Sequence, residues 1–358
     1  MGKHWLIILF LFGSYSIQAQ KQLVAFNDSC LYYEGRILFH DKAAELSWPG
    51  TSVTIRFIGN ELSATMVDSD TADYYNTIVD GKVHSIIHVG TEKKKYKLVS
   101  GLTEGEHTVQ LFKRTEWDKG KTLFYGFELP PEARVLPKLA PKKRKIEFYG
   151  NSITCGYANE DAAGQDRWYG YFENNYEAYG AITARHFDAN YSCIAKGGIG
   201  IMVSWFPLLM PEMYDRIDPT DSLSSWDFSK FSPDLVVINL FQNDSWLVHK
   251  PEHEQFIFRF GAKPPTETDI ILAYKRFVSS IREKYPNTPI ICALGSMDAT
   301  REGSPWPGYI ERALLQMNDP DIHTLFFPFK GSNGHPNVAE QHKMADQLIG
   351  YIEKTFGW

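Results

Sequence analysis

Alternating apolar and polar positions dominate the first third of the chain. Runs of this kind cover residues 52–57, 61–67, 75–79, 82–87, 107–112 and 122–127. Gly59-Asn60 and Asp80-Gly81 separate neighbouring runs, and Asp-Gly between alternating runs is a strong hairpin signal. Short strands with turn residues between them predict an all-β jelly-roll sandwich over residues 20–135.

The pattern changes at Ile146, where short continuous apolar runs begin to alternate with helical periodicity. The runs predict strands at 146–150, 190–195, 234–240, 288–294 and 322–327. The periodic segments predict helices at 179–187, 269–285, 309–316 and 338–356. Alternation of strands and helices predicts an α/β/α domain over residues 146–358, with a mostly parallel sheet covered on both faces.

A linker over residues 136–145 is expected between these domains. Pro137 and Pro141 interrupt regular structure there, and residues 142–145 form the basic run Lys-Lys-Arg-Lys. Such a run is either a patch for an anionic surface or a solvated linker, and we favour the linker.

The first nineteen residues have the pattern of a secretory signal. A basic start at Lys3 and His4 precedes a short apolar run, Trp5 to Phe12, and Ala19 offers a small residue for cleavage. The run is too short to span a bilayer. We therefore expect a secreted or periplasmic protein with no stable membrane insertion after cleavage.

Composition excludes some classes of function and leaves others open. The apolar fraction is 43% and the net charge is −6, which argues against a nucleic-acid-binding surface. No CxxC or HExxH spacing suggests a metal site, and no cofactor is implied. The four cysteines are too few for a disulfide framework, although one bridge between Cys155 and Cys193 is left open.

Three polar residues follow predicted strands or precede the last helix. Ser152 comes directly after strand 146–150, Asn243 follows strand 234–240, and His335 precedes helix 338–356. A hydroxyl nucleophile, an imidazole base and a neutral amide donor are the components of an acyl-transfer site. The alternative for Ser152 and for Asn243 is the N-cap of the following helix.

The flanking residues resemble a known family. Gly150-Asn151-Ser152, Gly197-Gly198-Ile199-Gly200, Asn243-Asp244 and His335-Pro336 resemble the four blocks of SGNH (GDSL-type) hydrolases. Residues 145–157, together with 77–81 and 113–116 in the β region, are similar to carbohydrate esterase family 2, which includes acetyl xylan esterases. The resemblance implies a jelly-roll domain followed by an SGNH-hydrolase domain, secretion, and removal of acetyl groups from polysaccharides such as xylan.

The resemblance also implies roles for individual residues. Ser152 would be the nucleophile and His335 the base, and the oxyanion hole would comprise Ser152 N–H, Gly198 and Asn243. The family usually has Asp two or three residues before the His, where this chain has Ser332 and Asn333. We therefore expect a Ser–His dyad, with the imidazole held by a main-chain carbonyl near Ser332.

Aromatic side chains on loops near the predicted sheet edge are candidates for binding a sugar ring. These candidates are Trp246, Trp205 and Trp306, although such residues also fill cores. Arg114 and Glu116 either bridge the two domains or pair on a surface hairpin.

The expected partner is an acetylated polysaccharide or oligosaccharide. Two alternatives stay open: a glycan-binding protein with a degenerate, inactive SGNH site, and a broader lipid or aryl ester hydrolase.

Overall fold

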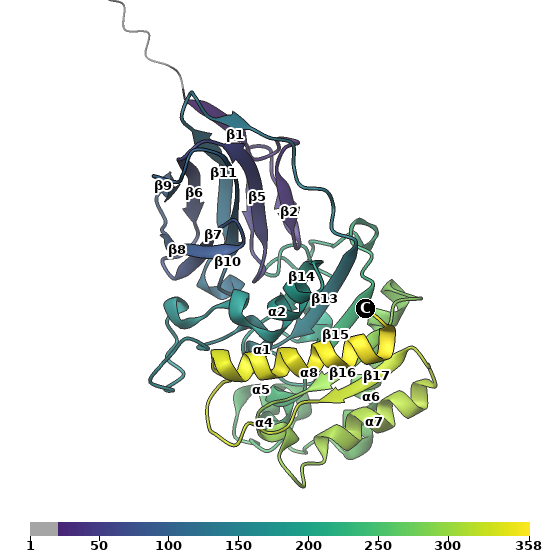
Figure 1. Cartoon of the computed structure of the whole chain (residues 1–358). Helices are drawn as coiled ribbons and strands as arrows, with labels where there is room; N and C mark the ends of the chain where they lie inside the picture. The colour runs from purple at the N-terminus through teal and green to yellow at the C-terminus, as the bar shows by residue number, and fades with distance from the viewer. Residues whose placement is uncertain (1–20) are drawn as a thin grey trace, which may run out of the picture.

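The computed structural model describes residues 21–358, so the predicted signal peptide lies outside the described residues. A β-sandwich domain comes first and an α/β domain follows it (Figure 1). The strands of the sandwich are β1 (Gln22–Ala25), β2 (Tyr32–Glu34), β3 (Ile37–Phe39), β4 (Ala44–Leu46), β5 (Ser52–Ile58), β6 (Leu62–Asp68), β7 (Asp73–Val79), β8 (Lys82–Val89), β9 (Lys94–Val99), β10 (Glu106–Lys113), β11 (Thr122–Leu129) and β12 (Arg134–Val135).

Two antiparallel sheets form the sandwich. One has the order β3-β4-β11-β6-β9, with β1 on β11, and the other has the order β12-β5-β10-β7-β8, with β2 on β5. The predicted alternation is confirmed: Val53, Ile55 and Phe57 of β5 are buried in the core between the sheets. The Asp80-Gly81 turn joins β7 to β8 as the sequence predicts.

The α/β domain is built on a five-stranded parallel sheet with the order β14-β13-β15-β16-β17. Its strands are β13 (Arg144–Gly150), β14 (Ala189–Ala195), β15 (Leu235–Asn239), β16 (Ile290–Leu294) and β17 (Ile322–Phe326). Its helices are α1 (Ser152–Cys155), α2 (Tyr179–His186), α3 (Met210–Met213), α4 (Gln242–Leu247), α5 (Glu254–Phe260), α6 (Glu267–Lys284), α7 (Trp306–Met317) and α8 (Val338–Phe356). Short 3₁₀ turns occur at η1 (Trp117–Lys119), η2 (Gly170–Phe172), η3 (Asn175–Glu177), η4 (Phe228–Lys230) and η5 (Asp298–Thr300).

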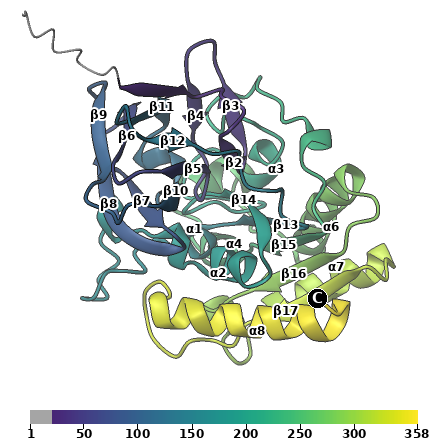
Figure 2. The same ribbon diagram turned by 45° about the horizontal axis from the view of Figure 1, so that its top comes forward.

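Helices cover both faces of this sheet, as predicted. Ile238 and Cys292 pack in one cluster with residues of α3, α6 and α7. Val237 and Ile291 face the opposite way and pack with residues of α2 and α8. Figure 2 shows α8 on one side of the strands and α3 and α6 on the other. The carboxyl ends of β13 and β15 are therefore free to carry a site.

The connection between the domains is shorter than predicted. Arg144 and Lys145 are the first two residues of β13, so they do not belong to a linker. Lys142 is also engaged, because its Nζ lies 2.9 Å from Glu34 Oε1 and 3.3 Å from Ala189 O. The prediction that the whole basic run is a solvated linker is therefore wrong.

Arg114 joins the two domains, which confirms one of the two expectations for it. Its buried guanidinium donates to Asn76 Oδ1 in the sandwich at 2.9 Å. It also donates to the carbonyls of Tyr171 and Glu173 in the α/β domain, at 3.1 and 3.2 Å, and pairs with Glu160. A buried charged group needs hydrogen-bonding partners. Because the partners of Arg114 lie in both domains, these contacts stabilise the interface between the domains.

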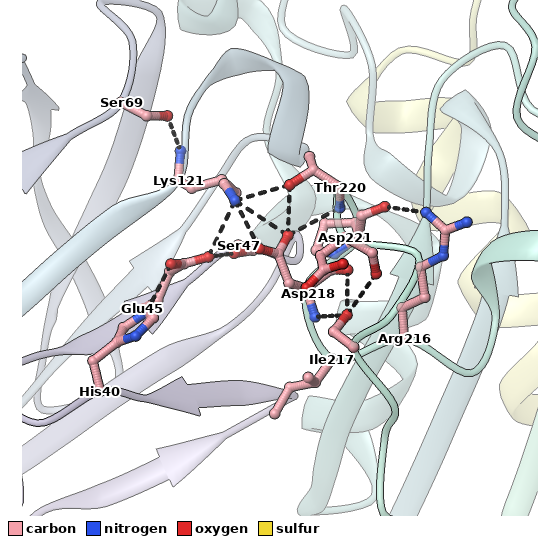
Figure 3. Close-up of polar contacts among 12 residues, drawn as sticks. His40, Glu45, Ser47, Ser69, Lys121, Arg216, Ile217, Asp218, Thr220 and Asp221 are labelled. Atoms are coloured by element: carbon pink, nitrogen blue, oxygen red, sulfur yellow. Dashed lines mark hydrogen bonds and ion pairs between the residues drawn. The ribbon is translucent and has the colours of Figure 1, made fainter.

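A second polar contact between the domains centres on Lys121 of the sandwich (Figure 3). Lys121 Nζ lies 2.9 Å from Asp218 Oδ2 and 2.9 Å from Thr220 Oγ1 in the α/β domain. It also lies 3.5 Å from Glu45 Oε1, and Glu45 in turn contacts His40 at 2.9 Å. This group, which we call the Lys121 network, is partly buried.

All four cysteines are free thiols, so the bridge left open between Cys155 and Cys193 is not formed. Both side chains are buried. No helix within residues 21–358 is long and apolar enough to cross a membrane.

Candidate active site

Ser152 lies at a sharp turn between β13 and α1. A Cβ at Gly150 would collide with the side chain of Thr154, so the turn requires glycine. Asn151 caps α1, because its Oδ1 accepts a hydrogen bond from Ile153 N at 3.0 Å. The capping role is thus filled by Asn151, and the hydroxyl of Ser152 remains available for another partner.

That partner is His335. His335 Nε2 lies 2.8 Å from Ser152 Oγ, although the two residues are 183 positions apart in the chain. The imidazole precedes α8, whose N-cap is Asn337. The predicted meeting of hydroxyl and imidazole at one sheet edge is confirmed.

A carboxylate completes the arrangement, which corrects the prediction of a dyad. Asp166 Oδ2 lies 2.9 Å from His335 Nδ1, and Asp166 Oδ1 accepts from His335 N at 2.9 Å. Ser332 and Asn333, the residues expected near the ring, instead contact Lys330. Because an ionised carboxylate only accepts, the proton lies on Nδ1 and Nε2 is free to accept from Ser152.

The surroundings of Asp166 favour its ionised form. Partial burial alone would raise the pKa of Asp166, but the hydrogen bonds and charge of His335 outweigh burial and hold that pKa below its usual value. The carboxylate therefore stays ionised near neutral pH, where it can orient the imidazole and stabilise its cation.

The loop of residues 161–167, which is closed by hydrogen bonds between its own residues, positions Asp166 beside the imidazole. Asp161 accepts hydrogen bonds from Ala163 N and Arg167 N, each at 3.1 Å. Its carboxylate also binds the guanidinium of Arg167, with Nη2 at 2.5 Å. Asp166 itself adopts φ 52°, a left-handed conformation that Asp tolerates better than most residues. These contacts fix the residues on either side of Asp166.

Asn243 and Gly198 line the same cavity as Ser152. Asn243 Oδ1 accepts from Trp205 Nε1 at 3.1 Å, and Asn243 Nδ2 donates to Ile199 O at 2.8 Å. These two contacts fix the orientation of the amide, and its second N–H has no acceptor among residues 21–358. Gly198 adopts φ 80°, which glycine tolerates without strain.

Asp244 stabilises the segment that follows Gly198. Its buried carboxylate accepts from the main-chain N–H groups of Ile201, Met202 and Val203 at 2.7–3.2 Å. Burial raises the pKa of Asp244 to about 6, even though these hydrogen bonds act in the opposite direction. Asp244 therefore holds the main chain of residues 201–203, which follow Gly198 in the same turn.

A cavity of about 340 Å³ opens over these groups. Ser152, His335, Gly198 and Asn243 line it together with Asp166. One cavity therefore contains a nucleophile, a base, a carboxylate that orients the base, and neutral hydrogen-bond donors. These are the groups that serine acyl transfer requires.

The predicted aromatic residues divide into two groups. Trp205 and Trp246 line the cavity, and Trp246 Nε1 donates to Asp298 at 2.8 Å. Trp306 is buried at the start of α7, with its ring centroid 5.0 Å from that of Phe241. The prediction that Trp306 contacts substrate is therefore wrong, since it belongs to the core.

Sequence reasoning missed a third tryptophan of the cavity, Trp168. Its side chain is 57% exposed and lies two residues after Asp166. Lys119 of the sandwich lies under it, with Nζ 3.5 Å from the ring centroid. The sequence does contain a signal for this residue, because a tryptophan in a polar, irregular segment is a candidate for a binding surface.

Within residues 21–358, no group of three or more His, Cys, Asp or Glu side chains is arranged to hold a metal ion.

Both domains match known families. Residues 33–138 match the carbohydrate esterase 2 N-terminal domain, and residues 148–324 match the GDSL-like lipase/acylhydrolase family. The cellulase/esterase CelE of Acetivibrio thermocellus is 34% identical over 92% of this chain, which spans 40% of the length of that relative. An acetylxylan esterase/glucomannan deacetylase of Cellvibrio japonicus is 25% identical over 98% of both chains.

A solved structure agrees with these matches. It is a family two carbohydrate esterase from Clostridium thermocellum in complex with cellohexaose, with 34% identity and a TM-score of 0.81 over 92% of this chain and 99% of that one. The chain therefore belongs to carbohydrate esterase family 2, a family of carboxylic-ester hydrolases.

Proposed function

We propose that the protein is a secreted O-acetyl esterase that removes acetyl groups from polysaccharides such as xylan by a serine acyl-enzyme mechanism. The observation that carries this proposal is the continuous contact from Ser152 through His335 to Asp166 inside the cavity. The names of the relatives, acetylxylan esterase and glucomannan deacetylase, support the substrate class.

In the first half of the reaction, Ser152 Oγ attacks the acetyl carbonyl and its proton passes to His335 Nε2. The tetrahedral oxyanion receives hydrogen bonds from Ser152 N–H, Gly198 N–H and the free N–H of Asn243. Preorganised donors of this kind stabilise charge as it develops. The carbon–oxygen bond to the sugar then breaks, and His335 returns the proton to the departing hydroxyl.

In the second half, water attacks the acetyl-enzyme. His335 takes a proton from the water, the same donors hold the second oxyanion, and the bond to Ser152 Oγ breaks. Acetate leaves, and the serine recovers its proton from His335. Throughout, Asp166 keeps the imidazole in the tautomer that this sequence of transfers requires.

The two alternatives have less support. The evidence for an inactive glycan-binding protein is the absence of Asp at position 151 and before His335, and Asp166 supplies the second of these carboxylates from another loop. For a lipid hydrolase, the cavity is lined by polar and aromatic side chains such as Glu116, Lys196 and Trp205. Aromatic faces with nearby polar groups suit sugar rings better than acyl chains.

Export is part of the proposal because of the basic start and short apolar run of residues 1–19. A secreted or periplasmic enzyme would meet polysaccharide outside the cell.

Acetate release from acetylated xylan, glucomannan and pectin tests the proposal. We expect release from at least one of these substrates, and loss of that release in Ser152→Ala. The variant should retain its fold, because Ser152 does not cap α1. Absence of acetate release by wild-type protein, combined with unchanged glycan binding in Ser152→Ala, would favour the glycan-binding alternative.

A further inference from the structure

We propose that Glu116, from the β-sandwich domain, is a positioning residue for the oxyanion hole: together with Lys196 it orients the Gly197–Gly198 peptide so that Gly198 N–H faces the cavity. This inference rests on the proposed function. It assigns the sandwich a part in the reaction, in addition to any part in binding glycan.

Glu116 reaches the site from the turn between β10 and η1. Its side chain is buried and lines the same cavity as Ser152 and Gly198. Its main-chain N–H donates to Glu173 Oε1 of the α/β domain at 2.6 Å. The turn is therefore anchored on the α/β domain next to the reacting groups, which confirms the expectation that Glu116 bridges the domains.

Gly197 is held at both of its peptide groups: Glu116 holds the preceding peptide through Gly197 N, and Lys196 holds the Gly197–Gly198 peptide through Gly197 O. The carboxylate of Glu116 accepts a hydrogen bond from Gly197 N. Lys196 Nζ donates to Gly197 O at 3.1 Å. In a trans peptide the carbonyl and the next N–H point in opposite directions, so fixing Gly197 O also fixes the direction of Gly198 N–H.

Other contacts leave that N–H as a donor for substrate. Gly198 O accepts from Trp205 N at 3.1 Å, whereas within residues 21–358 Gly198 N–H has no recorded acceptor. A Cβ at position 197 would lie 2.8 Å from Glu116 Oε1, so a larger residue there would displace this carboxylate.

Charge keeps Lys196 in place. Its ammonium group lies 3.3 Å from Glu116 Oε2 and 2.7 Å from Asp118 Oδ2, both in the sandwich. Burial alone would lower the pKa of Lys196, but these two carboxylates outweigh it and raise that pKa above its usual value. The lysine stays charged, and two residues of the sandwich hold it against Gly197 O.

Glu173 belongs to the same buried cluster as Glu116. Burial raises the pKa of Glu173 well above its usual range, and the charge of Glu116 adds to the effect. Truncating Glu116 removes one charge from this cluster and leaves Lys196 paired with Asp118, so we expect the variant to fold.

Glu116→Ala, Glu116→Gln and a control variant test the inference with p-nitrophenyl acetate. We expect Glu116→Ala to lower kcat by about tenfold to a hundredfold with little change in KM, since loss of a whole oxyanion donor costs about a hundredfold to a thousandfold. Glu116→Gln keeps an acceptor oxygen for Gly197 N–H and should recover most of the loss. The control is Asp218→Asn, which breaks an ion pair between the same domains outside the cavity and should leave kcat unchanged.

Two further measurements make the result decisive. Rates are divided by the fraction of Ser152 labelled by a fluorophosphonate, so that misfolded protein does not count. Affinity for a boronic acid, which forms a tetrahedral adduct with the serine, should fall in parallel with kcat. If Glu116→Ala does not fold, Glu116→Asp replaces it under the same criteria, since its oxygens are drawn back from Gly197.

The outcomes separate this inference from the proposed function. An active wild type with equal kcat in Glu116→Ala, or equal losses in Glu116→Ala and Asp218→Asn, overturns the positioning role alone. A loss that appears only in KM also overturns it. A wild type without esterase activity overturns the proposed function instead.

Discussion

The carboxylate of Asp166 accepts hydrogen bonds from both the main-chain N–H and the Nδ1–H of His335, a residue 169 positions further along the chain. The two contacts fix the loop before α8 and the orientation of the imidazole at the same time.

Asp166→Asn should therefore lower kcat by about a hundredfold to ten thousandfold. The amide can present N–H groups to the imidazole in place of an acceptor, and it lacks the charge that stabilises the cation. Turnover of p-nitrophenyl acetate checks this result. Asn333→Ala is the matched control, because Asn333 lies two residues before His335, where the family usually has Asp, and within residues 21–358 its side chain makes no hydrogen bond to the ring; we expect nearly full activity. Equal activity in both variants would contradict the role of Asp166.

Hydrogen bonds within the loop that carries Asp166 should affect the rate of the reaction. Asp161→Ala removes the acceptor for Ala163 N, Arg167 N and the guanidinium of Arg167. We expect kcat to fall by about tenfold, since small misplacement of a catalytic group is costly. Asp227→Ala removes a similar local cap from Ser229 N at η4, away from the cavity, and should leave kcat unchanged. A similar loss in both variants would rule out a specific effect of the loop.

Trp168 and Trp306 should respond differently to truncation. Trp168→Ala should raise KM for acetylated xylo-oligosaccharide by about threefold to tenfold, the usual contribution of one aromatic face, with little effect on p-nitrophenyl acetate. Trp306→Ala should instead lower the free energy of unfolding by about 3–5 kcal/mol through a core cavity. Kinetics on both substrates and denaturant unfolding distinguish the two. An unchanged KM for oligosaccharide in Trp168→Ala would remove that residue from the binding surface.

The Lys121 network should make stability depend on pH. Partial burial alone would raise the pKa of Asp218, but its hydrogen bonds with Thr220 and Lys121 lower it overall. A carboxyl group with a depressed pKa in the folded state contributes stability above its unfolded pKa near 4, and loses that contribution as the pH falls through the folded value. Asp218→Asn should thus lower the free energy of unfolding by about 1 kcal/mol at pH 7.

Urea unfolding of wild type and Asp218→Asn at several pH values checks this dependence. The difference between the two proteins should shrink as the pH is lowered from 4 toward 2. A difference that stays constant over this range would show that the ionised form of Asp218 is not what stabilises the contact between domains.

Much of the fold follows from local periodicity. Burial of one face of β5 or both faces of β15 imposes a pattern on consecutive residues, so these strands are visible in the sequence within a residue or two of their ends. Ser152 and Asn243 could be predicted for a related reason, because parallel strands bring their carboxyl ends to one edge.

Asp166 could not be predicted in this way. It lies in an irregular loop without periodicity, and its contact with His335 depends on how that loop folds back. The neighbouring residues Ser332 and Asn333 suggested the wrong partner, because sequence proximity was used in place of geometry. The prediction that Trp306 binds substrate was wrong because the periodicity around it was overlooked. Trp306 begins an apolar stripe that continues with Ile310 and Ala313 in α7, and such a stripe indicates a core position.

The contacts of Arg114 have a consequence for modular exchange. Its guanidinium is shared between Asn76 on one side and the carbonyls of Tyr171 and Glu173 on the other, so it would be buried without the latter acceptors if the sandwich docked on an unrelated domain. A chimera that joins this sandwich to an unrelated hydrolase should be insoluble unless it also contains residues 171–173.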